Sequence, residues 1–468
     1  MAEPEALEAA RAGLHGHEAW VVGGAVRDRL LGRDVGDVDV VVGGDVRDAA
    51  RHLGRAARGP AFELSGDFGA WRVVGPQGRW QVDVTARHGA TIEEDLARRD
   101  FTINAMAEPL HGGVRVDPHG GAADLAAGVL RMVAPAAFDD DPLRCLRLAR
   151  FACELDFAVD PATREAARQR APRVADVAGE RVFAELKRLV AAPDPVAGVR
   201  LLDDLGLLSP VVPEIEALRG VGQSRYHHLD VLDHTLAVVQ EAVELEARPE
   251  EVLGDAGLGR RAAALLAEPL ADDLTRGTAL RIGALLHDAA KPQTRTEYGE
   301  GHVGFPRHDE EGAVVARDVL TRLRASERLR AHVAALCRHH LRLGFLVKDA
   351  PLPARQVHRY LRACAPVAAD VTLLTVCDRL ATRGRKADEA IARHLDLARV
   401  LLAAALDERE APRRPALIRG DELARELGIR PGPQLGRLLA ELEEARYAGE
   451  VRTREDAVTH ARRVLAGQ

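Results

Sequence analysis

Two aspartates separated by a single residue, Asp37 and Asp39, are the carboxylates of this sequence best suited to catalysis. They begin a Val-rich run, 38–42, that predicts a β-strand, and side chains two apart on a strand point to the same face. Paired carboxylates on a rigid strand suit two Mg²⁺ ions, which activate an attacking hydroxyl and neutralise a leaving pyrophosphate. Asp37 and Asp39 are therefore predicted to be catalytic and to hold both ions.

A glycine pair precedes these carboxylates and favours the same chemistry. Gly23 and Gly24 follow a short predicted strand, 20–22, and open a predicted helix whose first turn contains Arg27. Glycine lets the backbone approach a phosphate closely, the amides of a helix N-terminus bind anions, and arginine can donate two parallel hydrogen bonds. An aspartate pair alone more often marks a solvated strand start, but its combination with this turn favours a nucleotide-binding site.

Two histidines and two aspartates further along the chain suggest a second metal site. His234, the adjacent His287 and Asp288, and Asp378 lie in apolar stretches of helical character. If they converge from different helices, they can hold a divalent metal that activates water for phosphoester hydrolysis. Buried His–Asp pairs also occur as structural networks, so the residues alone leave both interpretations open.

A further helix is predicted to begin after a run of aspartates. Asp141, Arg144, Arg147 and Arg150 recur every third residue and therefore share one face of that helix. By itself this pattern is typical of an ordinary salt-bridged helix face.

Together these segments resemble the motifs of class II tRNA nucleotidyltransferases, the family of CCA-adding enzymes and poly(A) polymerases. The segment 23–39 is similar to the first motif of that family, and the string RRDFTINAMA at 98–107 is similar to the second. The resemblance implies that Arg99 contacts the triphosphate of a bound nucleotide. It also implies that Asp100 and Asn104 lie near the ribose 2′-hydroxyl.

The helix that follows resembles the base-reading motif of the family, usually Glu-Asp-x-x-Arg, with Asp140 here in place of the glutamate. The resemblance implies that Asp141 and Arg144 hydrogen-bond the base edges of incoming CTP or ATP, so that a protein template replaces a nucleic-acid one. Arg147 and Arg150 would support the phosphates or that first pair.

Two more features carry the resemblance further. The family often has a third carboxylate on the strand that contains Asp83, which we keep outside the core set. The order His…His-Asp…Asp is similar to that of the HD metal-phosphohydrolase family. Some HD proteins have additional ligands where His308 and either His339 or His340 lie.

The implied function is template-independent addition of CCA, from CTP and ATP, to the 3′ end of tRNA. Two Mg²⁺ ions would serve the first site and a divalent metal of unassigned identity the HD site, where phosphohydrolase activity would reside. The expected partners are tRNA, CTP and ATP, with no membrane and no obligatory protein partner.

Three alternatives stay open. Only nine residues, 84–92, separate Asp83 from the acidic run 93–95, whereas many CCA-adding relatives have a longer flexible loop here. An enzyme that adds only CC, or a poly(A) polymerase, is therefore an alternative within the class. An HD phosphohydrolase whose head only binds RNA is the alternative from another class.

The elements that must hold these residues differ along the chain. Short β-like runs bounded by Gly, Pro or Asp, at 20–22, 38–42, 71–74 and 80–84, are confined to the first 135 residues, and helical patterns follow to the end. We therefore predict an α+β fold, a small mixed α/β head followed by a long helical body. The resemblance implies four parts: a head of the polymerase-beta nucleotidyltransferase type (1–135), a helical neck for base recognition (136–220), an HD domain (221–385) and a helical RNA-binding tail (386–468).

Composition limits the remaining choices. The 468 residues include 65 basic and 72 acidic ones, a net charge of −7 that excludes bulk electrostatic attraction to RNA and requires local patches. Five cysteines without a CxxC pair predict reduced core residues rather than disulfides or a zinc site. The apolar runs are too short for a membrane span, and the acidic N-terminus lacks the features of a signal peptide, so the sequence predicts a cytoplasmic protein.

Overall fold

The computed structural model describes residues 5–65, 69–223, 229–299, 302–382, 387–411 and 415–467. Packing divides the chain into two compact units, Met1–Val211 and Val212–Gln468. The division falls inside the segment 136–220, which the sequence predicts as the neck. The predicted boundary between the HD domain and the tail, at 385/386, lies outside the described residues.

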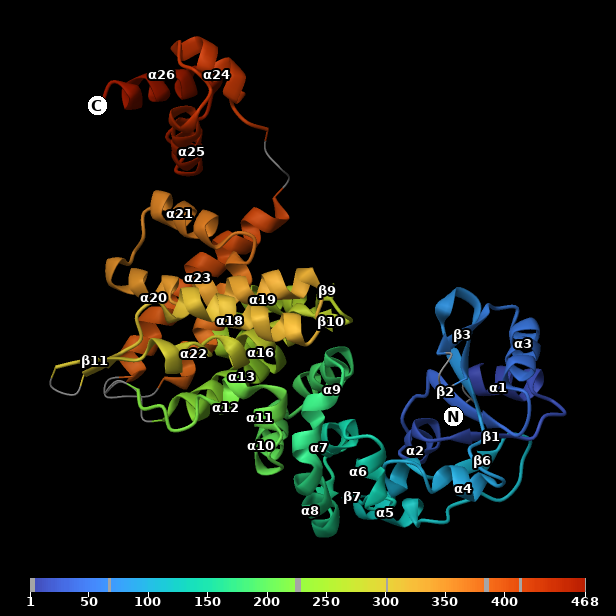
Figure 1. Cartoon of the computed structure of the whole chain (residues 1–468). Coiled ribbons are helices and arrows are strands. Elements are labelled where there is room, and N and C mark those ends of the chain that lie inside the picture. Colours follow the sequence, from blue (N-terminus) through green and yellow to red (C-terminus); the bar gives the residue numbers. More distant parts are fainter. Residues whose placement is uncertain are drawn as a thin grey trace. The chain divides into compact units, whose positions relative to one another are not determined.

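The first unit begins with a six-stranded sheet in the spatial order β3-β4-β5-β2-β1-β6 (Figure 1). β2 and β5 are parallel, and the other neighbouring pairs are antiparallel. The strands are β1 (Ala19–Val22), β2 (Asp37–Val42), β3 (Ala61–Ser65), β4 (Ala70–Val74), β5 (Gln81–Ala86) and β6 (Ala107–Pro109).

Short helices flank this sheet. α1 and α3 pack against each other and against its strands, and α2 follows β1 directly. The helices are α1 (Glu5–Gly13), α2 (Gly24–Leu30), α3 (Val46–Ala57) and α4 (Ile92–Leu96), with 3-10 turns η1 (Pro76–Gly78) and η2 (Thr102–Asn104).

The alternation along β2 orients the predicted carboxylates. Asp37 and Asp39 are exposed, whereas Val38 and Val40 are buried, as the two-residue period of a strand requires. On the aspartate side of the sheet, Val41 belongs to a small core cluster with residues of β1, α4 and the segment after η2. That cluster leaves the aspartate end of β2 open.

The rest of the first unit is helical and is built around α7. α7 packs against α9 and α10, and it ends at Asp156, which has a left-handed backbone (φ 58°). The elements are α5 (Gly121–Ala127), β7 (Val129–Leu130), α6 (Ala136–Asp140), α7 (Leu143–Leu155), β8 (Ala158–Val159), α8 (Pro161–Arg170), η3 (Ala171–Asp176), α9 (Gly179–Ala191), α10 (Pro195–Asp204) and α11 (Leu208–Val211).

In the second unit, α16 packs against α13, α19 and α22 and forms the centre of a helical body. The elements are α12 (Pro213–Glu216), α13 (Val231–Ala247), α14 (Pro249–Leu253), α15 (Ala256–Ala267), β9 (Pro269–Ala271), β10 (Leu274–Thr275), α16 (Arg276–Leu286), α17 (Lys291–Thr294), β11 (Thr296–Tyr298), β12 (His302–Gly304), α18 (His308–Arg322), α19 (Glu327–His339), α20 (Arg342–Leu346), η4 (Val347–Asp349), α21 (Ala354–Cys364), α22 (Ala368–Ala381) and α23 (Ala387–Glu410).

The second unit ends in three helices with an apolar core of their own: α24 (Gly420–Leu427), α25 (Pro433–Tyr447) and α26 (Arg454–Leu465). Arg355 of α21 joins them to the body through ion pairs with Glu441 and Glu450, each at 2.6 Å. Within the described residues, no single helix is long and apolar enough to cross a membrane. Only α21 and α22 taken together pass that test, with a bend of 96° between them.

The structure confirms the predicted α+β class and the four strands expected at 20–22, 38–42, 71–74 and 80–84. β3, β6 and β7 were not predicted, and β8, β9–β10 and β11–β12 interrupt a region expected to be wholly helical. Strands of two or three residues are too short to show a two-residue hydrophobic period. The five cysteines are free, as expected.

Candidate active site and metal centre

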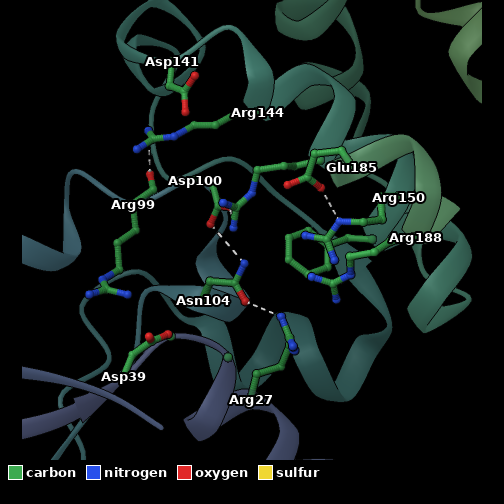
Figure 2. Close-up of a pocket in the computed structure, with 14 residues that line it drawn as sticks. Arg27, Asp39, Arg99, Asp100, Asn104, Asp141, Arg144, Arg150, Glu185 and Arg188 are labelled. Carbon is green, nitrogen blue, oxygen red and sulfur yellow. Dashed lines mark hydrogen bonds and ion pairs between the residues drawn. The ribbon is translucent and has the colours of Figure 1, made fainter. Parts of the chain in front are cut away.

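A polar cavity of about 400 Å³ opens in the first unit between the sheet and α7 (Figure 2). Every residue that the sequence predicts for nucleotide binding lines it, together with Asp39. Asp37 is on the same strand but is not among the lining residues. The residues that line the cavity are Gly23, Gly24, Arg27, Asp39, Arg99, Asp100, Asn104, Asp141, Arg144, Arg147, Arg150, Phe151, Glu185 and Arg188.

Three carboxylates lie side by side at the sheet end of this cavity. β2 and β5 run in parallel with Asp39 opposite Asp83, and Asp37 is two residues away on the aspartate face of β2. Asp83 accepts two hydrogen bonds from Arg72 at 2.7 and 2.8 Å. The third carboxylate that the resemblance suggested is therefore next to Asp39, but it is ion-paired.

The surroundings of Asp39 disfavour its negative charge. Burial by the surrounding protein raises its pKa, the positive charge of Arg99 lowers the pKa, and the negative charges of Asp83 and Asp37 raise it further. A carboxylate crowded by other carboxylates is stabilised by a cation. This arrangement fits divalent ions held by Asp37 and Asp39.

Gly23 occupies a position that only glycine fits. Its φ is +68°, and a Cβ built there would lie 2.9 Å from an Arg99 guanidinium nitrogen and 3.6 Å from Asp39 Oδ2. The turn thus brings the backbone against both the carboxylate and the arginine that the sequence assigns to phosphate.

A chain of polar side chains crosses the cavity from α2 to α7 (Figure 2). Arg27 donates to Asn104 Oδ1 at 2.7 Å, and Asn104 donates to Asp100 Oδ1 at 3.0 Å. Arg147 forms an ion pair with Asp100 at 2.7 Å. Burial acts to raise the pKa of Asp100, but Arg147 and the hydrogen bonds from Asn104 and the Phe101 amide outweigh it and lower that pKa. Asp100 is therefore a charged acceptor at neutral pH.

The proposed base-reading pair, Asp141 and Arg144, lies on the neck side of the same cavity. Arg144 donates to the carbonyl oxygens of Arg98 and Ala137 at 2.9 and 3.1 Å, and Asp141 accepts from Arg181 at 2.7 Å. Asp141 and Arg144 are therefore held by different hydrogen-bond partners. Arg181 lies in the first turn of α9, so this helix helps to orient Asp141.

A buried arginine lies behind these residues, and its partners were not predicted. Arg150 is 2% exposed and is ion-paired with Glu154 at 2.5 Å and with Glu185. Its guanidinium lies 3.9 Å from the centre of the Phe151 ring, while those of Arg27 and Arg147 lie 5.0 and 5.6 Å from it. The guanidiniums of three arginines thus lie within about 6 Å of one ring, so Phe151 packs against all three through cation–π contacts.

Sequence reasoning gave no cavity role to Phe151, Glu185 or Arg188. The available signal was the spacing of Glu185 and Arg188, three residues apart on one helix. Such spacing is common on solvated helices, so it did not distinguish these residues.

In the second unit, the four predicted metal ligands converge from three helices. His234 is in α13, His287 and Asp288 directly follow α16, and Asp378 is in α22. His234 Nε2 lies 3.1 Å from Asp378 Oδ1 and 3.7 Å from Asp288 Oδ2, and His287 Nε2 lies 3.2 Å from Asp288 Oδ2.

Two further histidines complete the cluster, and they resolve the ambiguity left by the sequence. His308 and His340 approach Asp288 Oδ1 at 3.5 and 4.0 Å. His339, by contrast, accepts a hydrogen bond from Arg342 and is not part of the cluster. Asp288 is common to two groups with the spacing of metal ligands, one with His234 and His287 and one with His308 and His340.

The histidine rings are already oriented for a metal. The Nδ1 atoms of His287, His308 and His340 each lie 2.6–2.7 Å from a backbone carbonyl three residues earlier, which directs Nε2 towards Asp288. His287 Nε2 is buried and faces Asp288 Oδ2 at 3.2 Å, and the same carboxylate oxygen is ion-paired with Lys291 Nζ at 2.7 Å. Imidazole nitrogens and a carboxylate that converge in this way are a donor set that fits a divalent metal.

Charges near the cluster keep the carboxylate ionised. Burial acts to raise the pKa of Asp288, but His287 and Lys291, whose Nζ lies 2.7 Å away, lower it well below its usual value. Burial lowers the pKa of His340 to about 4, so its imidazole is neutral at pH 7. The residues that line the adjoining cavity of about 740 Å³ include Lys291, Arg379 and Arg393. Their positive charges suit a ligand that bears phosphate.

Comparison with known proteins matches both sites to known families. Residues 19–85 and 72–131 match the Poly A polymerase head domain, residues 156–218 match the probable RNA and SrmB- binding site of polymerase A, and residues 231–383 match the HD domain. The A-adding tRNA nucleotidyltransferase of Deinococcus radiodurans is 37% identical over 448 residues, which cover 94% of each chain. The chain belongs to the tRNA nucleotidyltransferase family.

Other members of this family are similar over nearly the whole length. The CC-adding tRNA nucleotidyltransferase of Thermus thermophilus is 35% identical, over 94% of this chain and 92% of that one. The multifunctional CCA protein of Verminephrobacter eiseniae is 33% identical, over 92% and 98%. The solved CCA-adding enzyme of Thermotoga maritima, complexed with tRNA, shares the fold with a TM-score of 0.63 at 22% identity, over 99% and 96%.

Proposed function

We propose that this tRNA nucleotidyltransferase adds CCA to the 3′ end of tRNA, taking CTP and ATP without a nucleic-acid template. The observation that carries the proposal is the lining of one cavity by Asp39 of the sheet and by Asp141 and Arg144 of the neck. Carboxylates suited to catalysis and side chains suited to base recognition are thus within reach of a single bound nucleotide.

Asp37 and Asp39 hold two Mg²⁺ ions in this proposal. The raised pKa of Asp39 supports it, because a cation relieves the repulsion among neighbouring carboxylates. Bound magnesium activates the 3′-hydroxyl of the tRNA and neutralises the charge of the departing pyrophosphate.

The polar chain across the cavity orients the nucleotide. Asp100, kept ionised by Arg147, accepts a hydrogen bond from the ribose 2′-hydroxyl beside Asn104. Arg99 and Arg27 bind the triphosphate, next to the close backbone approach at Gly23. An acceptor matched to the 2′-hydroxyl selects ribonucleotides.

The protein itself acts as the template. Asp141 supplies an acceptor and Arg144 supplies donors, so the pair can complement the edge of cytosine or of adenine. Asp141 is held by Arg181, and Arg144 is held by the backbone carbonyl of Arg98, so each side chain is oriented independently of the other. The tail contributes tRNA contact through the exposed Arg430 beside the start of α25.

Addition of only part of CCA is the second candidate. Only residues 87–91 connect β5 to α4, which is a short segment where many CCA-adding relatives have a longer loop. Similar proteins are named A-adding in one organism and CC-adding in another. Both observations favour a division of labour between two enzymes.

Three tRNA transcripts distinguish these candidates. They end before CC, after the first C and after CC, and each is incubated with labelled CTP or labelled ATP alone. Full CCA addition predicts C on the first two and A on the third. Failure to incorporate ATP on the third leaves CC addition, incorporation only on the third leaves A addition, and a long tail from ATP alone indicates a poly(A) polymerase.

The HD site hydrolyses phosphoesters in the same proposal, with a divalent metal held by His234, His287, Asp288 and Asp378. Support comes from the buried convergence of imidazole nitrogens on Asp288 and from the presence of Lys291, Arg379 and Arg393 in the lining of the adjoining cavity. The test uses phosphomonoester and cyclic phosphodiester substrates with each of several divalent metals, and absence of hydrolysis with all of them would contradict it. A cytoplasmic location, where tRNA is available, belongs to the same proposal.

A further inference from the structure

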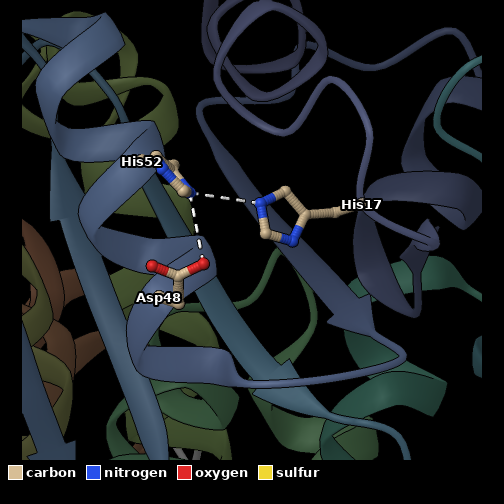
Figure 3. A group of neighbouring side chains, drawn as sticks. All are labelled: His17, Asp48 and His52. Carbon is tan, nitrogen blue, oxygen red and sulfur yellow. Dashed lines mark hydrogen bonds and ion pairs between the residues drawn. The ribbon is translucent and has the colours of Figure 1, made fainter.

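A group of two histidines and one aspartate lies on the head (Figure 3), and none of its residues lines either cavity. His17 is in the segment between α1 and β1, and Asp48 and His52 are one turn apart on α3. His17 Nε2 lies 3.3 Å from His52 Nδ1, which in turn lies 3.4 Å from Asp48 Oδ2. The side chains of His52 and Asp48 are 42% and 56% exposed, so that an ion from solvent can reach them.

The fold holds these side chains together firmly. α1 ends at Gly13, where an added Cβ would lie 2.7 Å from the Cα of Leu53, the residue next to His52. From that close contact the chain turns through Gly16, whose φ is +86°, and the His17 amide donates to the Leu14 carbonyl at 3.0 Å. The turn directs His17 back onto α3.

Hydrogen bonds within the group do not satisfy its three facing atoms at the same time. His52 Nδ1 faces a histidine nitrogen on one side and a carboxylate oxygen on the other. If it carries a proton, it donates to one neighbour and not fully to both. If it carries none, its lone pair faces the negative carboxylate. A cation between the three atoms satisfies all of them together.

We propose that His17, Asp48 and His52 form a surface site for a first-row divalent cation such as Zn²⁺. Ligand bonds of about 2.0–2.1 Å at a tetrahedral angle separate the ligand atoms by about 3.3–3.4 Å. His52 Nδ1 lies 3.3 Å from His17 Nε2 and 3.4 Å from Asp48 Oδ2, and both distances match this ligand spacing. Two imidazole nitrogens and one carboxylate oxygen are the donor set that zinc and its neighbours in the first transition row accept, with water in the fourth position.

The ion would link the segment that leads into β1 to the helix α3. None of its three ligands lines the cavity of the head or the HD cavity. The site therefore stabilises the head without taking part in nucleotide addition, and it is independent of the function proposed above.

Equilibrium dialysis of the metal-stripped full-length chain against ZnCl₂, with zinc counted by mass spectrometry, tests the proposal. His17→Ala, His52→Ala and Asp48→Asn are each expected to bind one zinc ion fewer per chain than the unchanged protein. His15→Ala is the matched control, because it removes a histidine from the same turn but not from the group. The HD ligands are intact in all four variants, so their zinc cancels in the comparison.

A second measurement checks that each variant is folded. Thermal melting without metal checks each variant, and added Zn²⁺ is expected to raise the melting temperature of the unchanged protein and of His15→Ala more than that of Asp48→Asn. Nucleotide addition with Mg²⁺ alone is expected to be equal in all of them. Equal zinc counts in the unchanged protein and in folded His52→Ala and Asp48→Asn overturn the proposal and leave a hydrogen-bonded cluster. Loss of the same ion in His15→Ala also overturns it.

Discussion

Replacement of Arg150 by alanine is expected to destabilise the first unit rather than to weaken phosphate binding. The guanidinium is 2% exposed, it is ion-paired with Glu154 and Glu185, and it lies against the Phe151 ring. Those two carboxylates are themselves only 20% and 12% exposed. Removing one partner of a buried ion pair leaves uncompensated charge and costs about 3–5 kcal/mol.

The expected shift is large enough to measure. For a unit of this size each kcal/mol lowers the melting temperature by about 2–4 °C, so Arg150→Ala is expected to lower it by roughly 6–20 °C. Arg188→Ala is the matched control, because that side chain is 54% exposed and pairs with Glu154 at 2.9 Å. Arg188 is itself solvated and its loss leaves Glu154 paired with Arg150, so the control is expected to cost about 1 kcal/mol or less and to shift the melting temperature little.

Calorimetry of the full-length chain gives the result directly. The transition of the first unit is identified as the one that CTP with Mg²⁺ moves to higher temperature, since a ligand stabilises the unit that binds it. Nucleotide addition by the variant is then measured well below its transition. If Arg150→Ala melts like Arg188→Ala but has a KM for CTP raised by tenfold or more, the guanidinium serves the nucleotide and the structural argument is refuted.

Four further variants test the two sites. Asp37→Ala and Asp39→Ala are each expected to abolish nucleotide addition with the fold intact, because loss of a metal ligand removes several kcal/mol of transition-state stabilisation; near-normal turnover in a single-nucleotide assay contradicts the catalytic assignment. Arg144→Ala is expected to reduce discrimination against UTP and GTP by roughly tenfold or more, since a pair of base hydrogen bonds is worth about 1–3 kcal/mol; a uniform slowing for all four nucleotides contradicts a base-reading role. His287→Ala combined with Asp288→Ala is expected to eliminate phosphohydrolase activity and to spare addition, and equal loss of both activities in a folded variant indicates a shared site.

The parts of the head site that could be predicted lie in short continuous motifs. The turn at Gly23, the alternation of Asp37 and Asp39 and the string 98–107 each encode their local geometry within a few residues. A strand period or a glycine with positive φ needs no knowledge of the rest of the fold. The HD ligands were recognisable because their order along the chain is distinctive.

The parts that could not be predicted depend on contacts between distant segments. The sequence gives no reason for Arg27 to bond to Asn104, which lies 77 residues away, or for Arg150 to be buried against Glu185. His339 and His340 are adjacent and chemically identical, so only the rotation of α19 decides which one faces Asp288. β6 is three residues long, and its pairing with β1 defines it as a strand.

The two metal sites differ in how their charge is balanced, and this suits them to different ions. In the head, burial and the neighbouring carboxylates raise the pKa of Asp39, so we expect a cation to arrive there together with the nucleotide phosphates, as Mg²⁺ does. In the HD cluster, Lys291 and the histidines already lower the pKa of Asp288, and most of the ligand atoms are imidazole nitrogens. Such a set gains little from the charge of a hard cation and favours a transition metal.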